Sequence, residues 1–522
     1  MKLTPAITNK KLALAACVLL AGVVLAVVSG LTPSDRRTDY VSYTESLPDF
    51  PFAVHDGSVG TASGKVIPAE LFDAAYFDAA NEKANESALF DRYYGEGSAA
   101  AETGFDTSLA PSAQKDFTAP GNPSFDREFA EKAVRNLSRS VALYARAEEA
   151  GETDAQAVKE EAALAAEKKL SVSGDFYDFT DYLLNCGFTR FEAGCIIYQY
   201  EYIKAAARAC ENRILSAFDA GVTDEDVNTE YKKHRIWYDV VDFRAVMVPP
   251  AAFTSDLAAE EFARQAAAVM TDAASFRAVS LASFGCSEQS YSDALLKKVR
   301  YADMSGSLSE ETVSWLFSRA RAAGDVRVEY VDGGVAAFLI ETPARKDESR
   351  PVNIRRLSVT NPTGGMTDEE LRTLFEDVRL AIEASDGSEA DFGRIVGAAS
   401  TDMYTAVNGG LAENVNSSML PEEVALALFA TERSPGDIIT VELTGGGWEI
   451  IYFISYSDSQ DWYVRVREEL SEENAAALDK ELSDTAESDV FAPDAVSSRR
   501  GTADAYMAAL AARMSRAGKA YG

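Results

Sequence analysis

The feature that most constrains this chain is an internal repeat in its second half. VDFRAVMV at 241–248 is matched by VNIRRLSV at 352–359, and LSEETVSWLFSRARAAGDV at 308–326 is matched by LPEEVALALFATERSPGDI at 420–438. Both matches are separated by about 112 residues, and both keep the order strand, helices, Gly-Asp turn, strand, Gly-rich turn, strand. The repeat predicts two copies of one α+β domain. The short turn before the last strand predicts that its sheet is antiparallel.

Length and periodicity place further regions around the repeat. A chain of 522 residues is too long for one ordinary core, and helical periodicity dominates from 126 to 237. We therefore expect an α+β multidomain protein, and its helical C-terminal tail is either solvated or docked on the first helical region. The predicted division is a cytoplasmic N-terminus at 1–11, a transmembrane signal-anchor at 12–31, a linker at 32–60, a helical domain at 61–237, repeat copies at 238–346 and 347–457, and a C-terminal tail at 458–522.

Local signals mark several helices. The segment 188–218 is apolar around much of its circumference, which predicts a central helix. Thr223 precedes three acids and is expected to cap the next helix. The motif TDEE at 367–370 is also best explained as a helix cap rather than as part of a phosphate loop, since the conserved Lys-Ser/Thr of such loops is missing.

The N-terminal segment predicts a membrane anchor. The uncharged apolar run from Leu12 to Leu31 has about the 20 residues that a spanning helix needs, and it is longer than the apolar core of a cleaved signal peptide. Lys10 and Lys11 favour a cytoplasmic N-terminus, so the bulk of the chain is expected to be extracytoplasmic, on a single-pass protein of the cell membrane. LAAC at 14–17 resembles a lipoprotein box, but most of the run follows Cys17, which leaves lipidation as an alternative.

Charge and ligand-type residues exclude several functions. With 50 Lys+Arg against 83 Asp+Glu the net charge is -33, which argues against a nucleic-acid partner. Cys195 and Cys210 fall on one predicted helix about 22 Å apart, too far for a disulfide. No cysteine motif has metal-binding spacing, and the two histidines, His55 and His234, have no triad or metal partners. We expect no metal and no cofactor.

Five motifs in the second copy belong together. They are ADFGRIVGAAS (390–400), NGGL (408–411), MLPEEVALALF (419–429), PGDI (435–438) and GGGWEIIYF (445–453). On these motifs the second copy resembles a parvulin-type peptidyl-prolyl isomerase domain over nearly its whole length. Together with the helical segment before the repeat, the chain resembles the SurA/PrsA-type foldases. The resemblance implies a SurA-N-like helical chaperone lobe followed by two degenerate parvulin-like domains in tandem.

The resemblance also implies where catalytic groups would lie. Parvulins place two histidines and a Cys or Asp beneath the amide bond that rotates. In the second copy the two histidine positions match Arg356 and Glu449, and Asp402 falls near the Cys/Asp position. Neither copy contains a histidine. These three residues are either a vestigial cluster held by ion pairs or a rewired active site.

The resemblance further implies an apolar pocket for the proline ring and the bound peptide. In the second copy its positions match Met419 or Leu420, Val424 and Phe429. The first copy looks fully degenerate. Its histidine positions hold Ala245 and either Ala336 or Ala337, and its pocket positions hold Leu308, Thr312 and Phe317.

These observations predict a membrane-anchored extracytoplasmic chaperone or foldase that binds unfolded or nascent secreted polypeptides, with weak or no prolyl isomerase activity. Two alternatives stay open: an active parvulin-type isomerase, and a scaffold subunit of a membrane protein complex. The sequence leaves open whether the chain is an enzyme. The family resemblance favours an isomerase, whereas the missing histidines argue against one. The sequence does not indicate an oligomeric state.

The anchor is tested by membrane fractionation of intact cells with protease added outside. We expect the full-length chain in the membrane fraction, digested from outside, because the run 12–31 is long enough to span. Recovery of a soluble product that begins after Leu31 would instead establish a cleaved signal.

Overall fold

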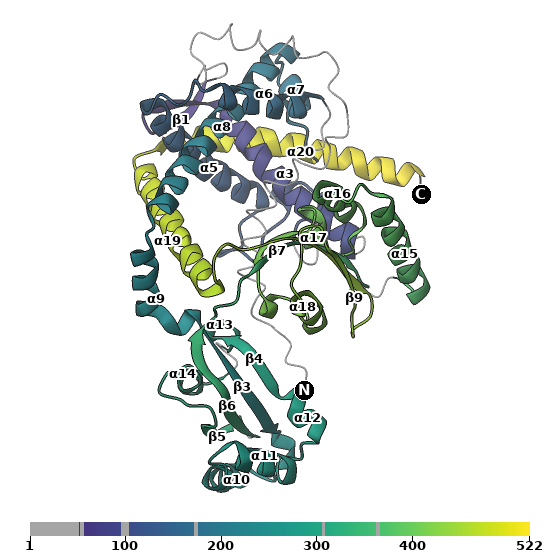
Figure 1. Cartoon of the computed structure of the whole chain (residues 1–522). Coiled ribbons are helices and arrows are strands. Elements are labelled where there is room, and N and C mark those ends of the chain that lie inside the picture. Colours follow the sequence, from purple (N-terminus) through teal and green to yellow (C-terminus); the bar gives the residue numbers. More distant parts are fainter. Residues whose placement is uncertain are drawn as a thin grey trace.

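The computed structural model describes residues 52, 57–94, 104–171, 176–304, 308–332, 334–361 and 366–521. It is a multidomain α+β structure with a helical lobe and two sheet domains (Figure 1). The predicted anchor at 12–31 and most of the predicted linker lie outside these residues. Within the described ranges, no helix combines the length and the apolar character required to span a bilayer.

The helical lobe is built around α8 (Arg190–Gly221), the predicted central helix. Thr189 and Glu192 form a capping box that starts it, and much of its first half is buried. Its neighbours are α3 (Ala69–Tyr94), α5 (Phe125–Glu149), α6 (Gln156–Ser171) and α7 (Phe179–Asn185), with the short turn η1 (Pro111–Ala113) between α3 and α5. A hairpin of β1 (Ser58–Ala62) and β2 (Lys65–Pro68) precedes α3, so the first described strand begins inside the predicted linker 32–60.

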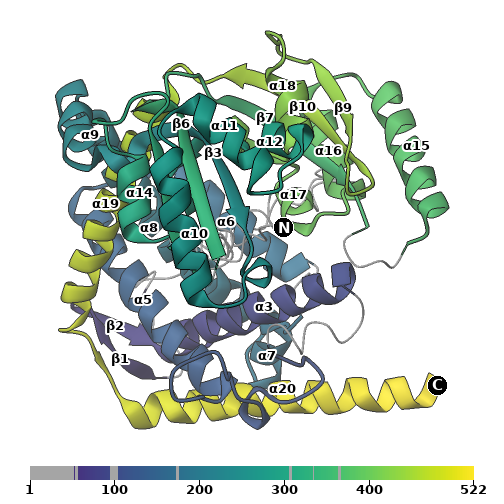
Figure 2. The same ribbon diagram turned by 90° about the horizontal axis from the view of Figure 1, so that it is seen from below.

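The C-terminal segment returns to this lobe and completes it. It consists of α19 (Asp461–Ala486), β11 (Val490–Phe491) and α20 (Pro493–Tyr521). The strand β11 pairs with β1, where a Cβ on Gly60 would come 2.0 Å from a β11 carbonyl oxygen. Ala503 and Met507 of α20 are buried in the main core, and α20 runs beside α3 in both views (Figures 1 and 2). The C-terminal tail is therefore docked on the helical lobe, which is one of the two alternatives that the sequence leaves open.

The helix α9 (Asp224–Tyr238) leads from the lobe into the first repeat domain, which we define as residues 239–346. Thr223 caps α9 with Asp226 in a capping box. The elements of the first repeat domain are β3 (Asp239–Val248), η2 (Pro250–Ala252), α10 (Asp256–Val269), α11 (Ala273–Ala282), α12 (Glu288–Asp293), β4 (Leu295–Arg300), α13 (Tyr301–Met304), α14 (Glu310–Leu316), β5 (Val326–Val331) and β6 (Gly334–Lys346).

The second repeat domain, residues 352–456, follows after five residues. Thr367 caps α15 with Glu370 in a capping box, at the TDEE motif. The elements are β7 (Val352–Val359), α15 (Asp368–Ala384), α16 (Glu389–Ala399), α17 (Met403–Val407), β8 (Leu411–Val415), η3 (Ser417–Met419), α18 (Glu422–Phe429), β9 (Ile438–Glu442) and β10 (Trp448–Tyr456).

The two repeat domains have the same sheet. The strand orders are β4-β3-β6-β5 and β8-β7-β10-β9, and every pair is antiparallel. Two helices cover one face of each sheet, α10 with α11 and α15 with α16, while α14 and α18 cover the opposite faces. The duplication seen in the sequence thus corresponds to two separate cores.

The sequence pattern missed the edge strands β4 and β8. Each contains a residue with positive φ, Lys298 and Asn414, and each pairs with a bulged partner strand. The backbone N–H of Lys298 donates to Asp242, and that of Asn414 donates to Asn353, so the same bulge is held by the same bond in both domains. A bulge breaks the alternation of buried and exposed residues, which is why these strands gave no clear period-2 signal.

The docking of α20 generates a stability prediction. Arg499 of α20 donates to the buried carboxylate of Asp73 on α3, with Nε 3.1 Å from Oδ1, and Tyr182 donates to the same group. Arg499→Ala would leave Asp73 buried without its charged partner, so we expect the variant to lose about 3–5 kcal/mol of unfolding free energy near neutral pH. Urea titration read by circular dichroism measures the loss.

This loss should depend on pH. Burial raises the pKa of Asp73 from 3.8 to about 6, although Arg499 and Tyr182 act to lower it. The folded state then holds the proton more tightly than the unfolded chain, so ionisation of Asp73 weakens the fold as pH rises from about 4 through 6. The cost of Arg499→Ala should shrink at about pH 5. Arg127→Ala, which removes an exposed pair with Glu131, should cost under about 1 kcal/mol at either pH. Equal losses for both variants would contradict the assignment.

Candidate functional site

Two of the predicted cluster residues meet on one face of the second repeat sheet. Arg356 on β7 and Glu449 on β10 form an ion pair, with Nη2 3.0 Å from Oε1 and Nε 3.3 Å from Oε2. Ser358, directly opposite Glu449 in the register, donates its hydroxyl to the same carboxylate at 2.6 Å. Glu449 is only 4% exposed. The carboxylate is therefore buried with three donors, which is the pattern of a satisfied structural charge.

Asp402 lines the same pocket as this pair but has a different structural role. It caps α17, where its carboxylate accepts the backbone N–H of Tyr404 at 3.2 Å. In the part of the chain that the structure describes, Arg356 makes its ion pair with Glu449, and no ion pair joins it to Asp402. The arginine therefore does not bridge the two carboxylates. Asp402 instead contributes to the wall of the adjoining pocket.

The pocket beside the pair has a volume of about 220 Å³ and is mostly polar. Its wall includes a residue that sequence reasoning missed: Tyr93, near the end of α3 in the helical lobe, which no local pattern connects to residues more than 250 positions later. The hydroxyl of Thr401 ties the wall together by accepting from the backbone of Thr360 and donating to the backbone of Ser358. The lining residues are Tyr93, Arg356, Ser358, Thr360, Thr401, Asp402, Met403 and Glu449.

The predicted peptide-binding residues divide into two groups. Leu420 and Val424 are buried in the domain core, where α18 packs on Ile354 and Phe453. Met419 and Phe429, in contrast, are 55% and 37% exposed. In the same region Leu426 on α18 is 65% exposed, a residue that the family positions did not point to. The surface formed by Met419, Leu426 and Phe429, called here the α18 surface, is the apolar part of the site that solvent can reach.

The corresponding face of the first repeat domain carries no comparable polar cluster at the histidine positions. Ala245 on β3 pairs with Phe338, while Ala336 and Ala337 pair with neighbouring residues of β3, and their methyl groups offer no hydrogen-bonding function. The pocket positions are also filled. Thr312 is buried and donates to the carboxylate of Glu329 at 2.5 Å, Phe317 is buried in the core, and Leu308 packs against that core.

The site gives no indication of a metal or a cofactor. Among the described residues, no group of three or more His, Cys, Asp or Glu side chains has a geometry that could hold a metal ion. The pocket of the second repeat domain presents hydroxyl groups, such as those of Ser358 and Thr401, and the carboxylates of Asp402 and Glu449 as acceptors.

The contacts of Glu449 and of Asp402 predict the effect of removing each carboxylate. Glu449→Ala leaves the Arg356 guanidinium and the Ser358 hydroxyl without their acceptor, so we expect a loss of about 1.5–3 kcal/mol in unfolding free energy. Asp402→Ala removes a helix cap and should cost about 0.5–2 kcal/mol. Urea unfolding read by hydrogen exchange of β10 measures both.

The matched control is Glu383→Ala on α15, which removes an exposed partner of Arg379 and should cost at most about 1 kcal/mol. A Glu449→Ala protein as stable as this control would show that the buried pair contributes nothing structural.

Comparison with known proteins identifies one of these domains. Residues 359–455 match the Rotamase family model, described as the PPIC-type PPIASE domain. No protein with curated annotation matches the sequence. The match starts at the last residue of β7 and ends within β10. It covers Asp402, Glu449 and the α18 surface, whereas Arg356 and Ser358 lie just before it.

Three similar solved structures are of proteins called PrsA. Peptidylprolyl isomerase PrsA from Bacillus anthracis is 14% identical, with 44% of this chain and 86% of that chain covered and a TM-score of 0.18. Foldase protein PrsA from Streptococcus pneumoniae str. Canada MDR_19A is 13% identical, with 75% and 92% covered and a TM-score of 0.19. Peptidylprolyl isomerase PrsA from Bacillus cereus is 11% identical, with 75% and 99% covered and a TM-score of 0.15. Because these TM-scores are low, the family assignment relies on the domain match: the second repeat domain is a parvulin-type domain of the PPIC-type peptidyl-prolyl isomerase family.

Proposed function

We propose that this protein is a membrane-anchored extracytoplasmic chaperone of the SurA/PrsA kind, which binds unfolded secreted polypeptides and has weak or no prolyl isomerase activity. The observation that carries the proposal is the buried network of Arg356, Glu449 and Ser358, which stands where parvulins have their catalytic histidines. The anchor is the apolar run at 12–31.

Catalysis of prolyl isomerisation needs groups that act on the twisted amide. The rotation barrier is about 18–20 kcal/mol, and only interactions that strengthen in the transition state lower it. In this domain the carboxylate of Glu449 already receives hydrogen bonds from Arg356 and Ser358 and is almost fully buried. Directing these groups at a substrate would require breaking that network, at the cost of leaving a charge unpaired.

Binding of an unfolded chain has smaller requirements. The α18 surface presents three apolar side chains to solvent, and burial of apolar area contributes about 25 cal/mol per Å². Such contacts are individually weak and non-directional, which suits reversible binding of many sequences. The net charge of -33 favours solubility of the chaperone while its apolar surfaces stay exposed.

Two other functions are distinguished by experiment. An active isomerase would accelerate Xaa-Pro exchange, which takes about 10–100 s without a catalyst at 25 °C. A scaffold subunit of a membrane complex would bind one folded partner and would not protect unfolded proteins in general.

The test pairs a prolyl isomerisation assay with an aggregation-suppression assay on the same purified full-length chain. We expect the isomerisation rate to stay close to the uncatalysed rate, while aggregation of a chemically unfolded protein is slowed. Strong acceleration that Asp402→Ala or Glu449→Ala abolishes would overturn the proposal and establish a rewired isomerase. Failure of both assays would favour the scaffold.

The α18 surface can be tested separately. The double variant Met419→Ser with Phe429→Ser should lower aggregation suppression by several-fold, because it replaces exposed apolar side chains with polar ones. Leu380→Ser is the matched control, since Leu380 is 53% exposed on α15 and outside this surface. Equal suppression by the double variant and the control would show that clients bind elsewhere.

A further inference from the structure

The first repeat domain is attached to the rest of the chain at one end. The chain enters it at Asp239 and leaves it at Lys346, and these two residues are partners in the register of β3 and β6. Both crossings therefore lie side by side and form a two-stranded stalk. In Figure 1 the domain extends away from the lobe and from the second repeat domain beyond this end. Such a body can rotate about the stalk unless other contacts hold it.

The buried carboxylate of Asp461 makes contacts that hold the first repeat domain in place. Asp461, the first residue of α19, is only 1% exposed. It receives Arg300 from β4 of the first repeat domain at 3.2 Å and Asn416 of the second repeat domain at 2.8 Å. Arg465, one turn along α19, donates to it at 2.9 Å and also to the backbone of α9. Three parts of the molecule thus meet at a single side chain.

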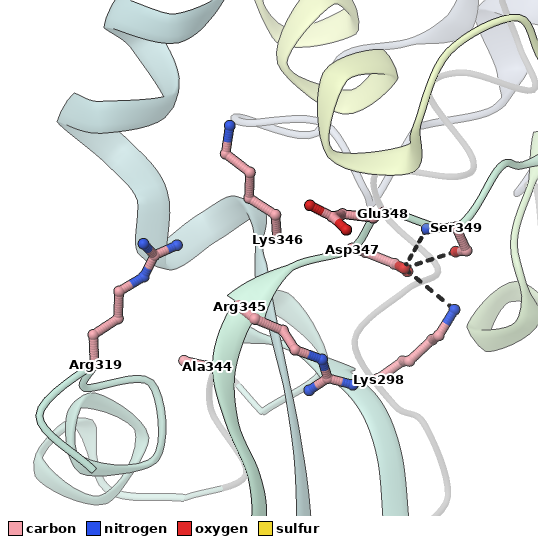
Figure 3. Close-up of a pocket in the computed structure, with 8 residues that line it drawn as sticks. All are labelled: Lys298, Arg319, Ala344, Arg345, Lys346, Asp347, Glu348 and Ser349. Carbon is pink, nitrogen blue, oxygen red and sulfur yellow. Dashed lines mark hydrogen bonds and ion pairs between the residues drawn. The ribbon is translucent and has the colours of Figure 1, made fainter. Parts of the chain in front are cut away.

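Polar and cation–π contacts surround Asp461. Lys298 of β4 pairs with Asp347, just after the stalk, at 3.2 Å, and Asp347 also accepts from Ser349 (Figure 3). The Nζ atom of Lys346 lies 3.2 Å from the ring centroid of Trp462 on α19. These are directional contacts between few atoms, and beside them Trp462 packs with Tyr231 and Tyr238 of α9 in a small apolar cluster.

Space is left beside these contacts. A pocket of about 610 Å³ opens between the stalk and the adjoining loops, lined by residues that include Arg319, Arg345 and Lys346 (Figure 3). Each of these cations already has a partner: Arg319 pairs with Asp239, Arg345 with Asp242, and Lys346 lies over Trp462. The pocket is therefore a gap in the junction rather than an anion site. Beside this gap, the first repeat domain is held by the stalk, by the polar contacts of Arg300 and Lys298, and by the packing of its core against Ile236 of α9.

The connecting helix α9 also departs from helical geometry close to the stalk. His234, five residues before Asp239, has φ -122° and ψ 28°, which kinks the helix. A kink at a connecting element is a position where a change of angle can be absorbed.

From this geometry we infer that Asp461 is a latch, which fixes the angle between the two repeat domains by holding Arg300 and Asn416 together. Releasing Arg300 lets the first repeat domain swing as a rigid body about its stalk. The sheet of each repeat domain stays intact in this motion, because all four strands of each sheet belong to one domain. The inference concerns the domain arrangement and holds whether or not the chain binds unfolded clients.

Distance measurement by pulsed electron paramagnetic resonance tests the latch in the full-length chain. One spin label is placed at Glu260→Cys on α10 of the first repeat domain and the other at Arg372→Cys on α15 of the second, in a background with Cys17→Ser, Cys186→Ser and Cys286→Ser. We expect a single narrow distance distribution for the unmodified junction. Asp461→Asn and Arg300→Ala should each widen it by about twofold or more, because the ion pair that fixes the angle is lost.

Controls separate the latch from a general loss of stability. Arg379→Ala, which removes an exposed pair on α15, should leave the distribution unchanged, and Arg300→Lys should restore most of the narrow component because it keeps the charge. If Asp461→Asn does not fold, Arg300→Ala decides alone, since Asp461 then still has Arg465 and Asn416. An unchanged distribution in Arg300→Ala would overturn the inference.

Discussion

The contact between Asp73 and Arg499 joins the N-terminal and C-terminal parts of the described chain in one lobe. These side chains are separated by 426 residues in the sequence, and each lies on a helix that contributes to the same core. Beside them, β11 adds to the hairpin of β1 and β2, so both ends of the described chain belong to one lobe. The chain leaves the lobe through α9, forms both repeat domains, and returns to the lobe through α19. Burial in this contact raises the pKa of Asp73 to about 6.

The two repeat domains share a fold but differ in the residues at the positions of the parvulin catalytic groups. A domain inserted into a closed scaffold needs its own sheet and core to fold, and both repeats keep the same strand order and the same bulge bond. The positions that would act on a substrate are free of that requirement. They hold small apolar residues in the first domain and a buried ion pair in the second.

The second repeat domain shows how a family match and a chemical site can diverge. The match at 359–455 spans the domain from the end of β7 into β10, including α18. The chemistry rests on Arg356, Glu449 and Asp402, which are charged groups with structural partners. The family match therefore identifies the fold of this domain. The proposed function depends instead on which side chains are exposed and could contact an unfolded chain. The α18 surface is what remains exposed.

The sequence by itself determined the local and repeated features. Thr223 and Thr367 cap helices where their acids predicted them, since capping involves residues within one turn. The duplication, the antiparallel last strands and the positions of Arg356 and Glu449 on facing strands could likewise be derived from pattern and resemblance. Only the tertiary structure decided that Asp402 lies outside the ion pair of Arg356 and Glu449, that Tyr93 of the lobe lines the pocket, and that Asp461 joins three parts. Each of these depends on residues distant in sequence, whose meeting is set by how domains pack and leaves no periodic signal in the chain.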